Sequence, residues 1–349
     1  MAKQFNKEIF IVARGCRGIS QADFAKKMSW SQGKVSKVEH GFLFVDEEEV
    51  LKVAQCLAFP AELFYEDSEV TGFGSCCQYD RKKLSTPVRR LSQLHDEINI
   101  RRIQVGRLLR GVDLPNELNF PDLDVDRFGG PEEVARVLRA TWQLPRGPIR
   151  NLINVVESAG GIVVMCDMPI PTIDAVSQRS RGLPHMFFLD KNKPVDRCRF
   201  TLAHEIGHLV MHNVPTPEAE SEADRFAAEF LMPMNEIKNE LRDLTLPKAA
   251  QLKLKWRVSM QALIYHAKRI GAITDQRYKS LYVRISQLGY RKNEPNPLQP
   301  EKPKMLRSII DLYLNERGFD LRQLSAAALC LEKEFKAEFL DNGPQLKII

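Results

Sequence analysis

Residues 201–212 read TLAHEIGHLVMH, and this stretch has the spacing of a helical metal site. His204 and His208 are four residues apart, so on a helix they share one face and can direct their ring nitrogens at one ion. Glu205 follows the first histidine and can act as the base for a water molecule at that ion. Because water activated by zinc beside a carboxylate hydrolyses peptide bonds, the pattern predicts a zinc hydrolase.

The same residues could instead be two exposed histidines on an ordinary amphipathic surface helix. Their neighbours disfavour this alternative, because the segment is too apolar for a solvated helix. The apolar neighbours are Phe200, Leu202, Ala203, Ile206, Leu209 and Val210. Buried histidine and glutamate side chains need polar partners, which a metal ion would supply.

A catalytic zinc site needs a third protein ligand, and the next predicted helix offers it. This helix covers residues 218–233, EAESEADRFAAEFLMP, and ends at a proline. Its candidate ligands are Glu218, Glu220 and Glu222. Glu220 is favoured because Asp224 lies four residues later on the same face, where it can accept the second N–H of a ligand histidine. Glu222 is the next choice.

These two segments, together with the preceding GGIVVMCDMPIPTIDAVSQ at residues 160–178, resemble the ImmA/IrrE family of metallopeptidases over about residues 130–290. The resemblance implies His204, His208 and Glu220 as zinc ligands, Glu205 as general base and Asp224 behind a ligand. It also implies a repressor protein as the substrate, cleaved at a specific site by a zinc-bound water.

Three further side chains near this pattern have open roles. His212 could be a fourth ligand or a transition-state donor, but a packed or capping histidine is favoured. His185 and Tyr265 are both able to donate a hydrogen bond to an oxyanion, yet the spacing places neither beside the metal.

Cys166 ends an apolar predicted strand, just before the loop that the resemblance puts beside the metal. Its thiolate could occupy the open zinc position and inhibit the site. The alternative is a small buried hydrophobic residue. The seven cysteines, odd in number and scattered, favour reduced thiols over a disulfide framework.

The amino-terminal stretch ISQADFAKKMSWSQGKVSKVEHG, residues 19–41, predicts a helix-turn-helix. It resembles the XRE, or Cro/CI-like, DNA-binding domain over about residues 6–67. By analogy Gln32, Ser36 and Lys37 are base-reading candidates on the second helix, and Gln21 and Lys34 are candidates for phosphate contacts. Residues 1–41 hold eight basic against three acidic side chains, which favours a double-stranded DNA partner. A helix-turn-helix used only for packing or dimerisation is the alternative.

The predicted domains are a helix-turn-helix domain at 1–68, a basic helical linker and connector at 69–129, a zinc peptidase domain at 130–245 and a helical region at 246–349. The linker carries nine basic residues from Arg81 to Arg110, interpreted mainly as a solvated face that can also touch DNA. Residues 246–273 have a second helix-turn-helix shape. It could bind nucleic acid, present the substrate or pack against the active site, and packing is favoured.

The predicted fold class is α+β and mostly helical, with an all-α amino-terminal domain, a zincin-like centre with a small sheet and a helical carboxyl-terminal region. The 44% of hydrophobic and 28% of charged residues, the absence of a membrane-length apolar run and the polar start MAKQFNKEIF predict a soluble, cytoplasmic protein. Paired operator half-sites would require a homodimer.

The predicted function is a DNA-binding transcriptional regulator with zinc endopeptidase activity toward a repressor. The alternative is a non-catalytic repressor or antitoxin-like regulator that uses the zinc fold as a sensor or partner-binding platform.

Overall fold

A three-stranded sheet lies at the centre of the computed structural model, which describes residues 4–70, 88–114, 118–214 and 216–340. The strands are β1 (Ile162–Cys166), β2 (Ala175–Gln178) and β3 (Met186–Asp190), in the order β1-β3-β2. β1 pairs parallel with β3, and β2 pairs antiparallel with it, so β2 is an edge strand. Every residue of β3 is buried, as expected for a strand covered on both faces.

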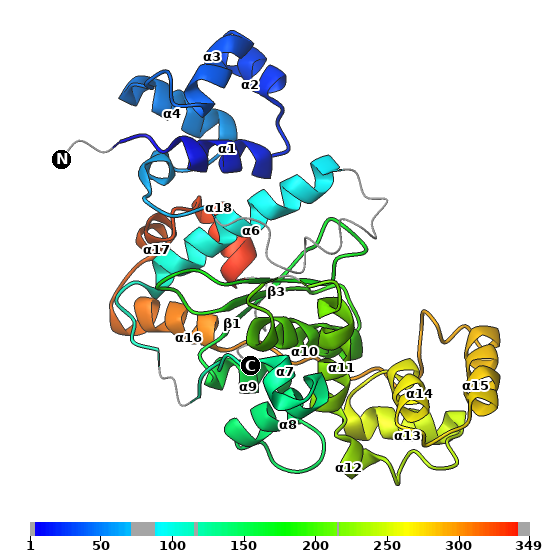
Figure 1. Cartoon of the computed structure of the whole chain (residues 1–349). Helices are drawn as coiled ribbons and strands as arrows, with labels where there is room; N and C mark the ends of the chain where they lie inside the picture. Colours follow the sequence, from blue (N-terminus) through cyan, green and yellow to red (C-terminus); the bar gives the residue numbers. More distant parts are fainter. Residues whose placement is uncertain (1–3, 71–87, 115–117, 215, 341–349) are drawn as a thin grey trace, which may run out of the picture.

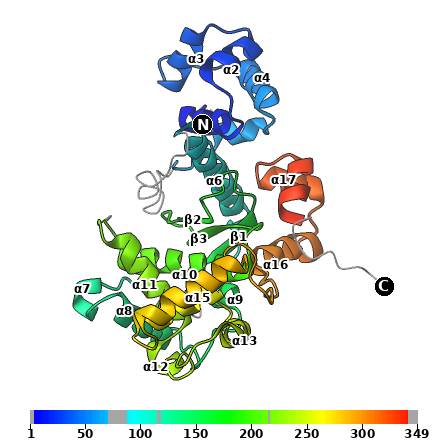
Figure 2. The ribbon, with the colours of Figure 1, turned by 90° about the vertical axis from the view of Figure 1, so that its right-hand side faces the viewer.

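The two faces of the sheet belong to two different hydrophobic cores. Val163 of β1 and Phe187 of β3 pack in one core with α10 (Val195–Met211) and α11 (Ala219–Leu231). Ile162 and Phe188, one residue away on each strand, pack in the other core with α6 (Val88–Leu109) and α16 (Met305–Asp311). Figures 1 and 2 show α10 and α6 on opposite sides of the sheet. The first core also contains residues of α8 (Pro131–Thr141), α9 (Leu152–Ser158) and α12 (Met234–Ile237), while α7 (Val125–Phe128) packs against it.

Helix α6 joins the amino-terminal helices to the sheet. Ile100 and Ile103 enter the amino-terminal core, whereas Val105 belongs to the core on the sheet. The predicted solvated basic face holds only in part among the described residues: Arg89, Arg90 and Arg110 are exposed. Two other basic side chains bond inward, because Arg101 donates to Glu338 at 2.8 Å and Arg102 bonds the backbone carbonyl of Glu69. Residues 71–87 and 115–117 of the predicted connector lie outside the described residues.

The amino-terminal helices include the predicted helix-turn-helix. Its helices are α2 (Gln21–Met28) and α3 (Gln32–Glu39), each begun by a serine whose side chain accepts a backbone N–H. Ser29 ends α2 in the left-handed region at φ 55°, which turns the chain toward α3. Around this pair lie α1 (Lys7–Cys16), α4 (Glu47–Leu57) and the 3-10 turn η1 (Ala61–Tyr65).

The helices after α12 repeat this turn. Arg257 ends α13 (Leu246–Trp256) at φ 56°, and Ser259 caps α14 (Met260–Arg269) two residues later. This is the helix-turn-helix shape predicted there, followed by α15 (Asp275–Gln287). The chain then returns to the sheet through α16, η2 (Leu312–Glu316), α17 (Leu321–Ala327), α18 (Glu332–Phe335) and η3 (Lys336–Leu340). Among the described residues, no helix has the length and apolarity needed to cross a lipid bilayer.

Candidate metal centre

The close approach of α10 and α11 builds the centre, and Gly207 permits it. A Cβ atom at Gly207 would lie 2.9 Å from a ring carbon of Phe226 and 3.4 Å from the Cα of Ala223. Real Cβ atoms are not found that close to a neighbour, so only glycine allows this packing. As a result the acidic first turns of α11 lie beside the histidine face of α10.

His204, His208 and Glu220 meet at one point. The Nε2 atoms of the two histidines lie 3.0 Å apart, and Glu220 Oε1 lies 3.2 Å from His208 Nε2. Glu220 Oε2 lies 3.8 Å from His204 Nε2. Two imidazole nitrogens bound to one tetrahedral zinc ion at about 2.0–2.1 Å would be separated by about 3.3 Å. The donor set and spacing therefore fit a divalent metal such as zinc.

The far side of each histidine ring is held as well. Asp224 Oδ1 lies 2.9 Å from His204 Nδ1, in the place expected from its position one turn after Glu220. Burial lowers the pKa of His204, but the hydrogen bond to Asp224 and the charges of Glu205 and Glu220 outweigh it and raise that pKa above the ordinary histidine value. The Asp224 bond leaves the Nε2 atom of His204 directed toward Glu220.

His208 is held by a histidine rather than by a carboxylate. Its Nδ1 lies 3.0 Å from His212 Nδ1, and His212 Nε2 lies 2.9 Å from Glu222 Oε2. An Nε2–H of His212 bonded to Glu222 leaves its Nδ1 as an acceptor for His208 Nδ1–H, which frees His208 Nε2 for a metal. His212 is the C-cap residue of α10, as expected for a capping histidine. Its ring also contacts the ligand candidate His208, and Glu222 bonds that ring.

Glu205 is buried, with 2% exposure, and points toward the sheet. The Ser177 hydroxyl on edge strand β2 donates to Glu205 Oε2 at 2.5 Å. No local pattern pointed to Ser177, because its partner is 28 residues away on a different element. The carboxylate of Glu205 is therefore fixed between α10 and the sheet edge.

Cys166 does not reach this centre, so its proposed role as an inhibitory ligand is not supported by its position. Its side chain packs in the core on the α6 face of the sheet, whereas α10 lies on the other face. Burial raises the pKa of the Cys166 thiol to about 12, which disfavours a thiolate. It is a small buried residue, the alternative named for it above.

The two candidate oxyanion donors are not part of the His–His–Glu group. His185 packs against Phe120 with ring centroids 5.2 Å apart, and burial lowers its pKa. Tyr265 is 54% exposed and lines a neighbouring cleft.

In the amino-terminal helices the predicted DNA contacts fall into two groups. Gln32 and Lys37 are exposed, and Ser36 is half-buried, so these base-reading candidates are accessible on α3. The two phosphate candidates already have internal partners: Gln21 donates to Glu39 at 2.5 Å, and Lys34 pairs with Glu49.

Residues 157–268 match the family model of the IrrE N-terminal-like domain, a family of metallopeptidases designated Peptidase M78. The match lies inside the segment expected from the resemblance and contains His204, His208 and Glu220. No curated protein matches the chain. The centre of the chain is therefore similar to metallopeptidase domains, while the match does not extend to the helices of residues 7–65.

Proposed function

We propose that this protein is a zinc endopeptidase attached to a DNA-binding helix-turn-helix domain, and that it cleaves a repressor protein. The convergence of His204, His208 and Glu220, with Glu205 alongside, is the observation that carries the peptidase part. The family match over residues 157–268 supports it at the level of a metallopeptidase-like domain.

In this proposal His204, His208 and Glu220 hold the ion. When bound, zinc supplies Lewis acidity that lowers the pKa of a coordinated water. Glu205 accepts the proton of the attacking water on a carboxylate oxygen and delivers it to the amine of the departing peptide. Ser177 holds the Glu205 carboxylate in place through its hydroxyl. A serine or cysteine nucleophile is not required.

The DNA-binding part of the proposal rests on the helices α2 and α3 and on the excess of basic over acidic residues in residues 1–41. α3 would enter the major groove with Gln32, Ser36 and Lys37 toward the bases. A repressor substrate is what the family resemblance implies, and a homodimer would allow two half-sites to be read together.

The test is a Glu205→Gln variant compared with the unaltered protein. Purified full-length chains loaded with zinc are incubated with candidate repressor proteins, and the bound zinc is measured by elemental analysis. We expect Glu205→Gln to retain zinc and to lose about 10²–10⁴-fold in cleavage rate.

Glu218→Gln is the matched control, because it removes the same charge from an exposed residue at the start of α11 and should leave the rate unchanged. Equal regulation of a reporter gene in cells by Glu205→Gln and the unaltered protein would instead favour the non-catalytic regulator.

A further inference from the structure

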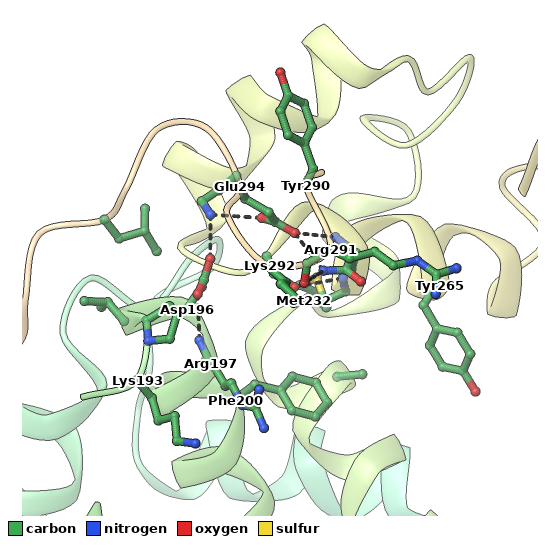
Figure 3. A pocket seen from close by; sticks show the side chains of 18 of the residues that line it. Lys193, Asp196, Arg197, Phe200, Met232, Tyr265, Tyr290, Arg291, Lys292 and Glu294 are labelled. Carbon is green, nitrogen blue, oxygen red and sulfur yellow. Dashed lines mark hydrogen bonds and ion pairs between the residues drawn. The ribbon is translucent and has the colours of Figure 1, made fainter. Parts of the chain in front are cut away.

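A cleft of about 760 Å³ separates the peptidase-like centre from the carboxyl-terminal helix-turn-helix. One wall comes from the start of α10, with Arg197 and Phe200, and the other comes from α14 and the loop that contains Arg291 and Glu294 (Figure 3). The cleft reaches Asp224, which bonds His204 Nδ1, so it lies behind one of the candidate metal ligands.

The walls of this cleft are fixed by a buried ionic cluster. Lys253, whose side chain is 4% exposed, bonds Asp196 at 2.6 Å and Glu294 at 2.9 Å. Glu294 also accepts the backbone N–H groups of Met260 and Gln261 at the start of α14. One cluster therefore ties together α10, α13, α14 and the loop, so the cleft is a built feature of the fold.

The charge that remains free in the cleft is positive. Seven basic side chains and three carboxylates line it, and the carboxylates are engaged by Lys253 and His204. Five of the seven cations are paired with carboxylates as well, which leaves Arg291 and Lys292. Arg291 and Lys292 are exposed on the loop, and neither has an ion-pair partner among the residues that the structure describes. A ligand with carboxylates would find uncompensated cations at this rim.

One face of α14 borders the cleft. Gln261, Tyr265 and Arg269, spaced four residues apart on this helix, line it. The volume suits a drug-sized molecule or a short stretch of polypeptide.

We propose that this cleft binds an acidic segment of a polypeptide, adjacent to the segment presented to the metal centre. Tyrosine and arginine side chains dominate contacts between proteins, and Tyr265, Tyr290 and Arg291 supply them here. The identity of that polypeptide as the substrate rests on the proposed function. The binding of an acidic peptide in the cleft is independent of the proposed function, because peptide binding can be measured without hydrolysis.

Fluorescence anisotropy on the full-length Glu205→Gln chain tests the cleft. The probes are two labelled peptides of equal length and equal apolar content, one with glutamates and one with glutamines at the same positions. We expect the glutamate peptide to bind about ten-fold more tightly, because it gains two charge contacts at the rim. Added salt should reduce this difference.

The double variant Arg291→Glu, Lys292→Glu should remove the preference for glutamate. Its control is Arg242→Glu, Lys302→Glu, which reverses one exposed arginine and one exposed lysine outside the cleft lining and should keep the preference. The proposal is overturned if both peptides bind the parent equally, or if the cleft and control variants behave alike. It is also overturned if free glutamate displaces the peptide at comparable concentration, because the cleft would then be a small-anion pocket.

Discussion

The Nδ1 atoms of His208 and His212 lie 3.0 Å apart, and this contact determines which nitrogen of His208 faces Glu220. His212 is in turn bonded to Glu222, so a carboxylate orients a metal-ligand candidate through an intervening imidazole. Groups that fix the tautomer and the orientation of a ligand histidine typically change metal affinity when they are removed.

We therefore expect His212→Ala to weaken zinc binding by about 10–100-fold. Competition with a chromogenic chelator on the purified full-length chain measures the affinity. His212→Asn, whose amide oxygen can accept from His208 Nδ1–H, should restore part of it. The control is His40→Ala, which removes an exposed histidine in the amino-terminal domain. An unchanged zinc affinity in His212→Ala would show that the contact has no positioning role.

Gly207→Ala should damage the centre without touching a ligand. Its methyl group would lie 2.9 Å from Phe226, so α11 must move away from α10 or the ring must shift. We expect a loss of about 1–3 kcal/mol in the free energy of unfolding, together with weaker zinc binding, because Glu220 moves with α11. Urea denaturation and the chelator competition measure the two effects.

Two further variants test whether the contact between Gly207 and Phe226 causes these effects. Gly33→Ala is the control, since its Cβ would meet only Ser31 Oγ at 3.9 Å and should not destabilise the chain. Phe226→Leu combined with Gly207→Ala should recover zinc affinity by making room. Full stability and zinc affinity in Gly207→Ala alone would contradict the packing argument.

Asp96 on α6 should make the stability depend on pH. Burial raises its pKa to about 7; the positive charge of Arg14 on α1 opposes this, and the neighbouring Glu97 adds to it. In the unfolded chain an aspartate titrates near about 3.9, so the folded protein retains a proton that the unfolded chain has lost between these values. Stability should therefore fall as the pH rises through about 4 to 7.

Asp96→Asn removes this titration. Because Asp96 is only partly buried, we expect the variant to be more stable than the parent at pH 8 by about 1 kcal/mol and to lose that advantage near pH 4. Urea midpoints measured across the range report it. Parallel pH profiles for the two proteins would rule out Asp96 as the group responsible.

Lys37 and Lys34 should differ in their contribution to DNA binding. Lys37 is exposed on α3, whereas Lys34 pairs with Glu49 and lies 4.2 Å from the centre of the Trp30 ring. On a random-sequence duplex, Lys37→Ala should weaken DNA binding and lower the number of counterions released on binding by about one. Lys34→Ala should have the smaller effect on both quantities. Anisotropy at several salt concentrations decides this, and equal losses in both variants would show that Lys34 leaves Glu49 to bind DNA.

The sequence alone determined the features that depend on local spacing. The four-residue interval placed His204 and His208 on one face, and Asp224 one turn after Glu220 indicated its bond to a ligand histidine. Serine caps and the proline after α11 predicted helix ends within about a residue. The mostly helical α+β class and the two helix-turn-helix shapes followed from the same local signals.

Tertiary structure decided the features that depend on which surfaces meet. Glu220 and Glu222 were both candidates until the packing of α10 on α11 at Gly207 directed one to the histidines and the other to His212. Cys166 was ambiguous because β1 is buried on both faces, so no polar alternation indicated which core its side chain enters. The hydrogen bond of Ser177 to Glu205 and the burial of α6 both depend on contacts between segments that are distant in the sequence. The spacing of residues along one element cannot predict such contacts.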